Sequence, residues 1–287
     1  MSTRSLRHLR GALATVALAT VALTTVSLAA SADARVTTPR STASGHSTVP
    51  KPTVVLVHGA FADSSGFDAV INRLLRDGYP VRAAPNTLVD LQSDAAAVRG
   101  FIDSIKGPKI LVGHSYGGAL ITQAASGDPD VKALVYLAAL APDSGEVLGD
   151  LLKKPVAHPV PPLPLVSVDV TQPDGTKRAE LYLDPSQFRA RFAADLPQDV
   201  AADLAATQRP LDEAAFTSTL TVEPAWKTIP SWYLVSNQDQ AMSPDLERFM
   251  ADRMHAHTSQ IDASHAAYIS HPEAVADLVE QAARATR

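Results

Sequence analysis

Short runs of consecutive apolar residues alternate with helical patterns along most of this chain. Four runs lack polar alternation, which is typical of strands buried on both faces of a parallel sheet. They are Thr53–Val57, Lys109–Val112, Val131–Leu137 and Ser231–Val235, with weaker candidates at Tyr79–Ala84 and Thr258–Ile261. Helical patterns fall at Phe67–Arg76, Leu91–Ile105, Gly117–Ala125, Pro244–Met254 and Pro272–Ala283. This alternation predicts an α/β fold, a mostly parallel sheet with helices on both faces.

The alternation stops at about residue 143 and resumes at about residue 230. Five prolines fall between residues 155 and 164, and Asp184-Pro185-Ser186-Gln187 then predicts a helix start with an N-cap and a proline in the first turn. Phe188 and Phe192 lie one turn apart on that helix, and residues 198–207 and 211–216 predict further short helices. We expect a mainly helical cap inserted over the carboxyl ends of the strands. The alternative is a separate small domain.

The N-terminus has the pattern of an export signal. Arg4, Arg7 and Arg10 precede an uncharged run from Gly11 to Ala30, and small residues follow at the two candidate cleavage sites, after Ala32 and after Ala34. We therefore expect a cleaved signal peptide at residues 1–34, a Ser/Thr/Pro-rich linker at 35–52, and one domain at 53–287. A retained membrane anchor is the alternative, because about twenty apolar residues can span a bilayer. After cleavage the protein is expected to be secreted, without stable membrane insertion.

Composition narrows the classes of function. The 287 residues have a formal net charge of −5, which argues against a general nucleic-acid binder because phosphate neutralisation needs a basic surface. There is no cysteine, so disulfides, thiolate metal sites and cysteine nucleophiles are excluded. The expected partner is a small molecule. The oligomeric state is left open by the sequence.

A candidate nucleophile follows the second apolar run. Gly113-His114-Ser115-Tyr116-Gly117 fits the pattern G-x-S-x-G, in which a sharp turn between strand and helix presents the serine hydroxyl. Small residues are needed on both sides because the chain doubles back closely there. A hydroxyl is a weak nucleophile and requires a base, itself oriented by an acid.

The chain order serine, acid, histidine selects the partners of Ser115. His265 lies in the loop beyond the last predicted strand, where a base is expected, whereas His255, His257 and His271 are placed at helix ends. Asp239 follows the strand at Ser231–Val235 and is the preferred acid. Asp143, at the comparable position after the strand at Val131–Leu137, is the competing candidate.

Backbone N–H groups must bind the oxyanion of an acyl-transfer reaction. Tyr116, which follows the serine, is one predicted donor, and Ala60 in His58-Gly59-Ala60-Phe61 is the other, with Phe61 as its alternative. No nucleotide-binding glycine motif is present, and His255 and His257 lack a third ligand at supporting spacing. We therefore expect neither a cofactor nor a metal.

These motifs resemble the α/β-hydrolase superfamily. The resemblance covers nearly all of residues 53–287, apart from the cap, and is carried by the run Val54–Ala60, by Gly113–Gly118, by Tyr136–Ala139 and by the stretch from Asp239 to His265. It is strongest toward the branch of methyl-salicylate esterases and hydroxynitrile lyases and its bacterial relatives. That likeness implies Ser115, Asp239 and His265 as a catalytic triad and Ala60 and Tyr116 as oxyanion donors.

The leading hypothesis is a secreted serine carboxylic-ester hydrolase that acts through an acyl-enzyme on small or medium, fairly apolar esters. Hydroxynitrile-lyase-like or cofactor-free perhydrolase chemistry is the alternative on the same fold. The lyases of this branch carry a lysine after the catalytic histidine, where this chain has Ala266, which disfavours cyanide chemistry. A third hypothesis is a ligand receptor that keeps the triad only as part of a pocket.

Overall fold

The structure, a computed structural model, describes residues 50–286. The predicted signal peptide and the predicted linker up to residue 49 lie outside the described residues. Among the residues described, no helix has the length and apolar character needed to cross a bilayer.

Six parallel strands make up the central sheet, in the order β2-β1-β3-β4-β8-β9. Their bounds are β1 (Thr53–Val57), β2 (Val81–Ala83), β3 (Lys109–His114), β4 (Val131–Leu137), β8 (Ser231–Ser236) and β9 (His257–Ile261). Every residue of β3 and β8 is buried, as expected of central strands covered on both faces. The predicted parallel sheet is therefore confirmed, and the two weaker candidates are its edge strands.

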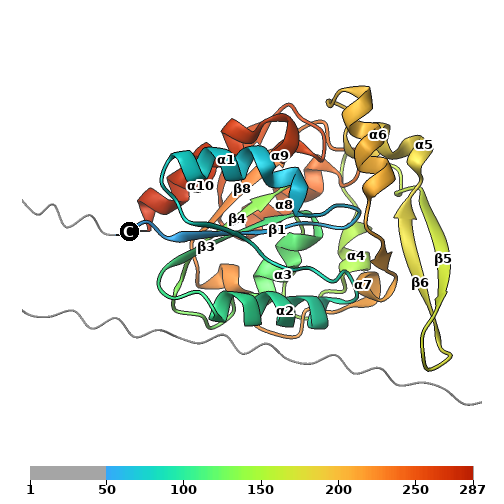
Figure 1. Cartoon of the computed structure of the whole chain (residues 1–287), viewed down its shortest axis with the longest axis horizontal. Helices are drawn as coiled ribbons and strands as arrows, with labels where there is room; N and C mark the ends of the chain where they lie inside the picture. Colours follow the sequence, from blue (N-terminus) through green and yellow to red (C-terminus); the bar gives the residue numbers. More distant parts are fainter. Residues whose placement is uncertain (1–49, 287) are drawn as a thin grey trace, which may run out of the picture. The chain divides into compact units, whose positions relative to one another are not determined.

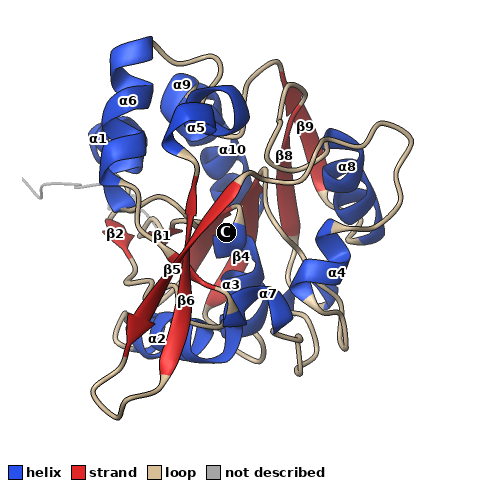
Figure 2. Cartoon of the chain, turned by 90° about the vertical axis from the view of Figure 1, so that its right-hand side faces the viewer, coloured by secondary structure: helices blue, strands red, loops and turns tan. Residues whose placement is uncertain are grey.

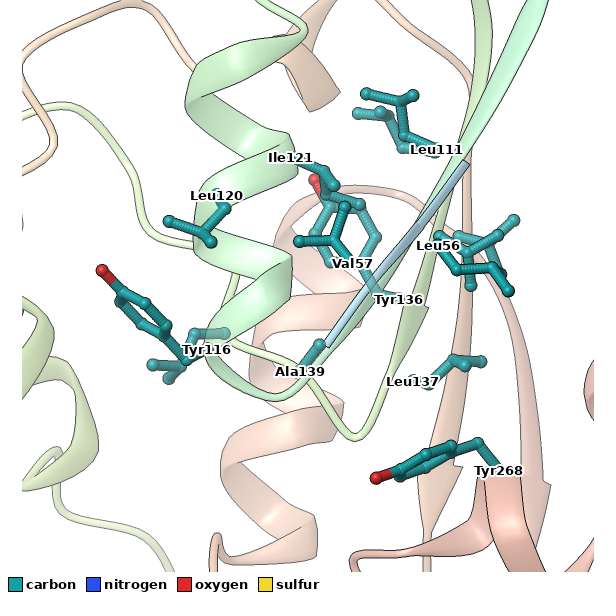
Figure 3. Packing of buried hydrophobic residues seen from close by; sticks show 14 of the residues in the cluster. Leu56, Val57, Leu111, Tyr116, Leu120, Ile121, Tyr136, Leu137, Ala139 and Tyr268 are labelled. Atoms are coloured by element: carbon teal, nitrogen blue, oxygen red, sulfur yellow. The ribbon is translucent and has the colours of Figure 1, made fainter. Parts of the chain in front are cut away.

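Helices cover both faces of this sheet. Those outside the cap are α1 (Asp68–Arg76), α2 (Leu91–Asp103), α3 (Tyr116–Ala124), α8 (Pro244–Arg253), α9 (Ala267–Ser270) and α10 (Pro272–Ala285), with a 3-10 turn η1 (Ser64–Phe67). Figure 1 shows α1 and α10 on one face of the sheet and α2 and α3 on the other. In Figure 3, Ile121 of α3 lies in the same buried cluster as Val57 and Tyr136 of the strands.

The segment between β4 and β8 lies at one end of the sheet. Its elements are α4 (Leu148–Leu152), β5 (Leu165–Thr171), β6 (Lys177–Leu183), α5 (Pro185–Phe192), α6 (Gln198–Thr207), β7 (Leu211–Asp212), α7 (Ala214–Thr217) and the 3-10 turn η2 (Ala225–Lys227). The predicted start of α5 is confirmed, because the Asp184 side chain accepts a hydrogen bond from the Ser186 N–H. Figure 2 views the cap face-on, with the β5–β6 hairpin in front.

Most residues of regular structure in the cap are helical, but the cap also holds an antiparallel sheet, β5-β6-β7, which the sequence analysis did not predict. Residues 211–216, predicted as one short helix, divide between β7 and α7. His257, predicted at a helix end, is the first residue of β9 instead.

The register of the sheet aligns the carboxyl ends of its strands. Val57 of β1 pairs with Gly113 of β3, and Leu137 of β4 pairs with Leu234 of β8. The loops that follow β1, β3, β8 and β9 therefore meet at one edge of the sheet, which is where open α/β sheets bind ligands.

Candidate active site

Ser115 occupies a sharp turn between β3 and α3. Its backbone is in a strained region, with φ 53° and ψ −122°, which L-residues rarely adopt. Glycines on both sides permit the turn: a Cβ on Gly113 would lie 2.6 Å from the Gly117 carbonyl oxygen, and one on Gly117 would lie 2.3 Å from that of Val57. The sequence pattern G-x-S-x-G is thus a packing requirement here.

Asp239 and His265 form a buried hydrogen-bonded pair. The His265 Nδ1 lies 2.5 Å from Asp239 Oδ2, and the two side chains are 3% and 0% exposed. Asp239 Oδ1 accepts backbone N–H groups from Ala241 at 2.6 Å and from Met242 at 2.9 Å. Three donors converge on this carboxylate, so it is held in one orientation.

A second histidine, His114, forms a hydrogen bond to the backbone of the loop that carries His265. His114 Nε2 lies 2.9 Å from the His265 carbonyl oxygen, and since a carbonyl only accepts, this nitrogen carries the proton. Complete burial lowers the pKa of His114 well below its ordinary value, so the ring is neutral. Its centroid lies 4.7 Å from that of His265. His114 therefore fixes the backbone of the loop that carries His265.

Ser115 and His265 line one narrow cavity of about 50 Å³. The remaining lining is mostly apolar and includes Leu140, Leu148, Leu163, Phe192 and Phe216. A larger groove of about 1000 Å³, under the proline-rich segment of the cap, shares Leu152, Leu163, Phe216, Ala241 and Met242 with it. The cavity is thus a narrow apolar recess beside a wide groove.

Residues of two loops border the same cavity. Ala60, Phe61 and Tyr116 line it, and a Cβ on Gly59 would lie 2.7 Å from Ser115 Cβ, which shows how closely the loop after β1 approaches. Among the described residues, neither Ala60 nor Phe61 has an acceptor for its N–H, and Tyr116 heads α3, where helical N–H groups lack internal acceptors.

The Tyr116 side chain is held away from this chemistry. Its hydroxyl donates a 2.8 Å hydrogen bond to Asp94, and burial raises its pKa above the ordinary range. The side chain is therefore a neutral anchor for the start of α3.

The competing acid, Asp143, is placed elsewhere. Its carboxylate pairs with Lys227 at 2.7 Å on the partly exposed loop after β4. Partial burial raises the pKa of Asp143, but the hydrogen bonds from Lys227 and the Ser144 N–H and the charges of Lys227 and Arg253 together outweigh burial, and the pKa lies below its ordinary value. The structure brings Asp239 to His265 and leaves Asp143 in a surface ion pair.

The other late histidines lie outside the cavity. His255 is exposed at the end of α8 with φ 50°, and His271 precedes α10 with Nδ1 3.9 Å from Asp195. Within residues 50–286 no group of three or more histidine, aspartate or glutamate side chains could hold a metal ion.

Two contributions were missed by the sequence analysis. From the cap, the Phe192 ring packs edge-on against His265 with centroids 5.0 Å apart, and Asp195 accepts a hydrogen bond from Ser264. From α8, the buried Glu247 lies behind Asp239. A signal for Glu247 existed: it shares the i, i+3, i+4 face of a helix with Met250 and Ala251.

Comparison of sequences places this chain among known hydrolases. Residues 54–278 match the model described as "Alpha/beta hydrolase family". The chain is 26% identical over 258 residues to a probable hydrolase of Phoma sp., covering 81% of this chain and 98% of that protein. It is 27% identical over 248 residues to a pyrethroid hydrolase of Sphingobium wenxiniae, covering 79% and 85%.

Solved structures agree in fold. A pyrethroid hydrolase from Sphingobium faniae superposes with a TM-score of 0.66 at 25% identity, covering 82% of this chain and 98% of that one. A polyneuridine aldehyde esterase superposes with a TM-score of 0.69 over 80% of this chain and 99% of that one, and its 17% identity supports the fold alone. By sequence over most of its length and by architecture, this chain belongs to the alpha/beta hydrolase family.

Proposed function

We propose that this hydrolase is a serine carboxylic-ester hydrolase that works through an acyl-enzyme. The observation that carries the proposal is the convergence of Ser115, His265 and the loop after β1 on one cavity, with Asp239 held against His265. Related proteins named as a pyrethroid hydrolase and a carbendazim hydrolyzing esterase support ester-type substrates.

The hydrogen bond to Asp239 defines the protonation of His265. Because the carboxylate accepts, Nδ1 carries the proton and Nε2 is left as a base. Nε2 takes the Ser115 hydroxyl proton as the oxygen attacks the ester carbonyl, and then gives it to the leaving alkoxide. Water repeats the sequence on the acyl-enzyme and releases the acid.

The oxyanion of each tetrahedral intermediate is bound by backbone N–H groups of the two loops that border the cavity. Tyr116 provides one donor and Ala60 the other, with Phe61 as the alternative. Preorganised donors of this kind contribute about 3–4 kcal/mol each to lowering the barrier. The chemistry we propose requires no cofactor.

The size and polarity of the two spaces support apolar esters. The recess at Ser115 is narrow and mostly apolar, so the reacting carbonyl and a small substituent fit there, and a larger apolar substituent extends into the groove. Burial of such a group contributes about 0.8 kcal/mol per methylene.

A fluorophosphonate probe tests the catalytic proposal. We expect the native protein to be labelled stoichiometrically and Ser115→Ala to be unlabelled and inactive on nitrophenyl esters. A folded native protein that neither reacts with the probe nor hydrolyses any ester would contradict the esterase proposal and favour the ligand-receptor hypothesis.

A series of nitrophenyl esters of increasing acyl length tests the substrate proposal. Leu165→Trp, in the wall of the groove but outside the recess, is expected to lower kcat/KM for long esters by about tenfold while sparing acetate, because the indole occupies space that the acyl methylenes would fill. Leu75→Trp, at an exposed position on α1, is the control. Equal loss on acetate and long esters would contradict the assignment of the groove.

We further propose that the protein is exported, on the basis of the basic start, apolar run and small-residue sites at residues 1–34. Expression of the full chain in a bacterial host, followed by mass spectrometry of the N-terminus, tests this. Export is expected to yield a protein that begins at Asp33 or Arg35. A cell-retained protein that keeps the leader would contradict it.

A further inference from the structure

A second buried carboxyl group lies behind the Asp239–His265 pair. Glu247 on α8 has no exposed surface, and its Oε2 accepts the Ser236 N–H at 3.0 Å. Its Oε1 has no donor among the described residues, although the side chain is in hydrogen-bonding contact with the Asp239 carboxyl group. Two carboxylates are acceptors only and repel each other, so a proton must lie between them.

The surrounding donors decide which carboxyl group holds that proton. Asp239 receives three donors, from His265 and from two backbone N–H groups, whereas Glu247 receives one. Within residues 50–286 no ion pair includes Glu247. The negative charge is therefore stabilised on Asp239 and the proton belongs to Glu247. In agreement, burial and the neighbouring Asp239 raise the pKa of Glu247 well above its ordinary value.

We propose that Glu247 is a protonated positioning residue whose Oε1–H donates a hydrogen bond to the Asp239 carboxylate. The otherwise unpartnered Oε1 then gains a partner, and the Asp239 carboxylate gains a fourth donor. This hydrogen bond orients the Asp239 carboxylate toward His265 and reduces the negative charge on the Asp239 oxygens. It acts through Asp239 and does not touch substrate.

Other charged or titratable groups lie around the pair. Arg248 on α8 bonds Asn237 at 2.7 Å and Asp245 at 3.1 Å, and Arg191 on α5 bonds the Gln240 carbonyl. Tyr233 on β8 is fully buried, and burial raises its pKa well above the ordinary value. His114, which contacts the His265 loop, is neutral, and His158 pairs with Asp245 at 2.9 Å.

The kinetic test rests on the proposed ester hydrolysis and compares Glu247→Gln with Glu247→Leu. Leucine removes the donor, so Asp239 becomes more basic and stabilises the His265 imidazolium. We therefore expect the acid limb of the kcat/KM profile to move up by about one pH unit. Loss of the hydrogen bond that positions the charged carboxylate is expected to lower kcat about tenfold. Glutamine, whose amide can donate to Asp239 and accept from Ser236, is expected to restore kcat to within about threefold.

The opposite result has a distinct signature. If Glu247 were ionised, glutamine would remove a negative charge near His265 and move the acid limb down, which overturns the proposal. A leucine variant with native kcat and native pH profile overturns the positioning role. Should Glu247→Leu fail to fold, the glutamine profile alone still decides the protonation state.

Infrared spectroscopy tests the protonation without any activity. The native protein at pH 7 is expected to show the carbonyl band of a protonated carboxylic acid, and Glu247→Gln to lose it. The same comparison in a Ser115→Ala background separates the two proposals, because absence of ester turnover leaves this band in place. A native spectrum without the band refutes the protonated Glu247.

Discussion

Gly117 tests whether the turn at Ser115 is imposed by backbone packing. It is the second residue of α3, where alanine would ordinarily stabilise a helix by up to about 1 kcal/mol. A Cβ there would lie 2.3 Å from the Val57 carbonyl oxygen and 2.9 Å from that of His58. Both are backbone atoms of β1 and its loop, so no side-chain rotation relieves the overlap.

Overpacking of this kind costs about 1–3 kcal/mol, and a backbone contact belongs at the upper end. After the helix-propensity gain we expect Gly117→Ala to lower the free energy of unfolding by about 2 kcal/mol. Gly100 on α2 is the matched control, since a Cβ there meets nothing within 4 Å. Gly100→Ala is expected to raise the free energy of unfolding by about 0.5–1 kcal/mol.

Urea denaturation followed by tryptophan fluorescence measures both variants, with equal m-values required for the comparison. In thermal unfolding, Gly117→Ala should lower Tm by about 4–8 °C. Opposite signs for the two substitutions support a packing requirement at the elbow. A Gly117→Ala protein as stable as Gly100→Ala would refute the reasoning, because helix propensity alone would then govern both sites.

Three further predictions concern individual carboxylates. Asp239→Asn, which removes the acceptor for the His265 Nδ1 proton, is expected to lower kcat by about 10⁴-fold with KM little changed, as steady-state kinetics would show. Asp143→Asn should leave kcat unchanged and cost less than about 1 kcal/mol in urea denaturation, because its lysine pair is partly exposed. Burial raises the pKa of Glu146, but the hydrogen bonds from Arg253 and the Asp143 N–H and the charge of Arg253 together outweigh burial, so the pKa lies below its ordinary value. The stability that this group provides is therefore present above the ordinary pKa and lost as pH falls through the folded pKa. Glu146→Gln should therefore flatten the acid side of the stability curve, and an unchanged curve would contradict this.

The sheet could be predicted because its central strands are buried on both faces and read as continuous apolar runs. The β5–β6 hairpin was missed although its signal is present: Val166, Val168 and Val170 alternate with polar residues, and Gly175 with φ 83° ends the turn. Alternation of this kind is typical of a strand with one apolar face, although Val166 and Val168 are 45% and 44% exposed in the structure.

The positions of Ser115, Asp239 and His265 could be predicted because each follows a strand whose neighbours fix where its loop lies. The contact of Asp239 with Glu247 could not, since it depends on how α8 packs against β8. A charged residue on the apolar face of a helix predicts burial, but only the tertiary structure shows what it meets.

The cap sets more than the size of the binding space. The Phe192 carbonyl accepts the Ala266 N–H at 3.1 Å and its ring packs on His265, so α5 holds the loop that carries the proposed base. The hairpin contributes Leu165 and Leu181 to the groove, and neither lines the recess at Ser115. A change of specificity built into the hairpin can therefore leave the base in place, whereas one built into α5 moves substrate wall and base together. Substitutions in α5 should accordingly alter kcat for every ester, and those in the hairpin only kcat/KM for large ones.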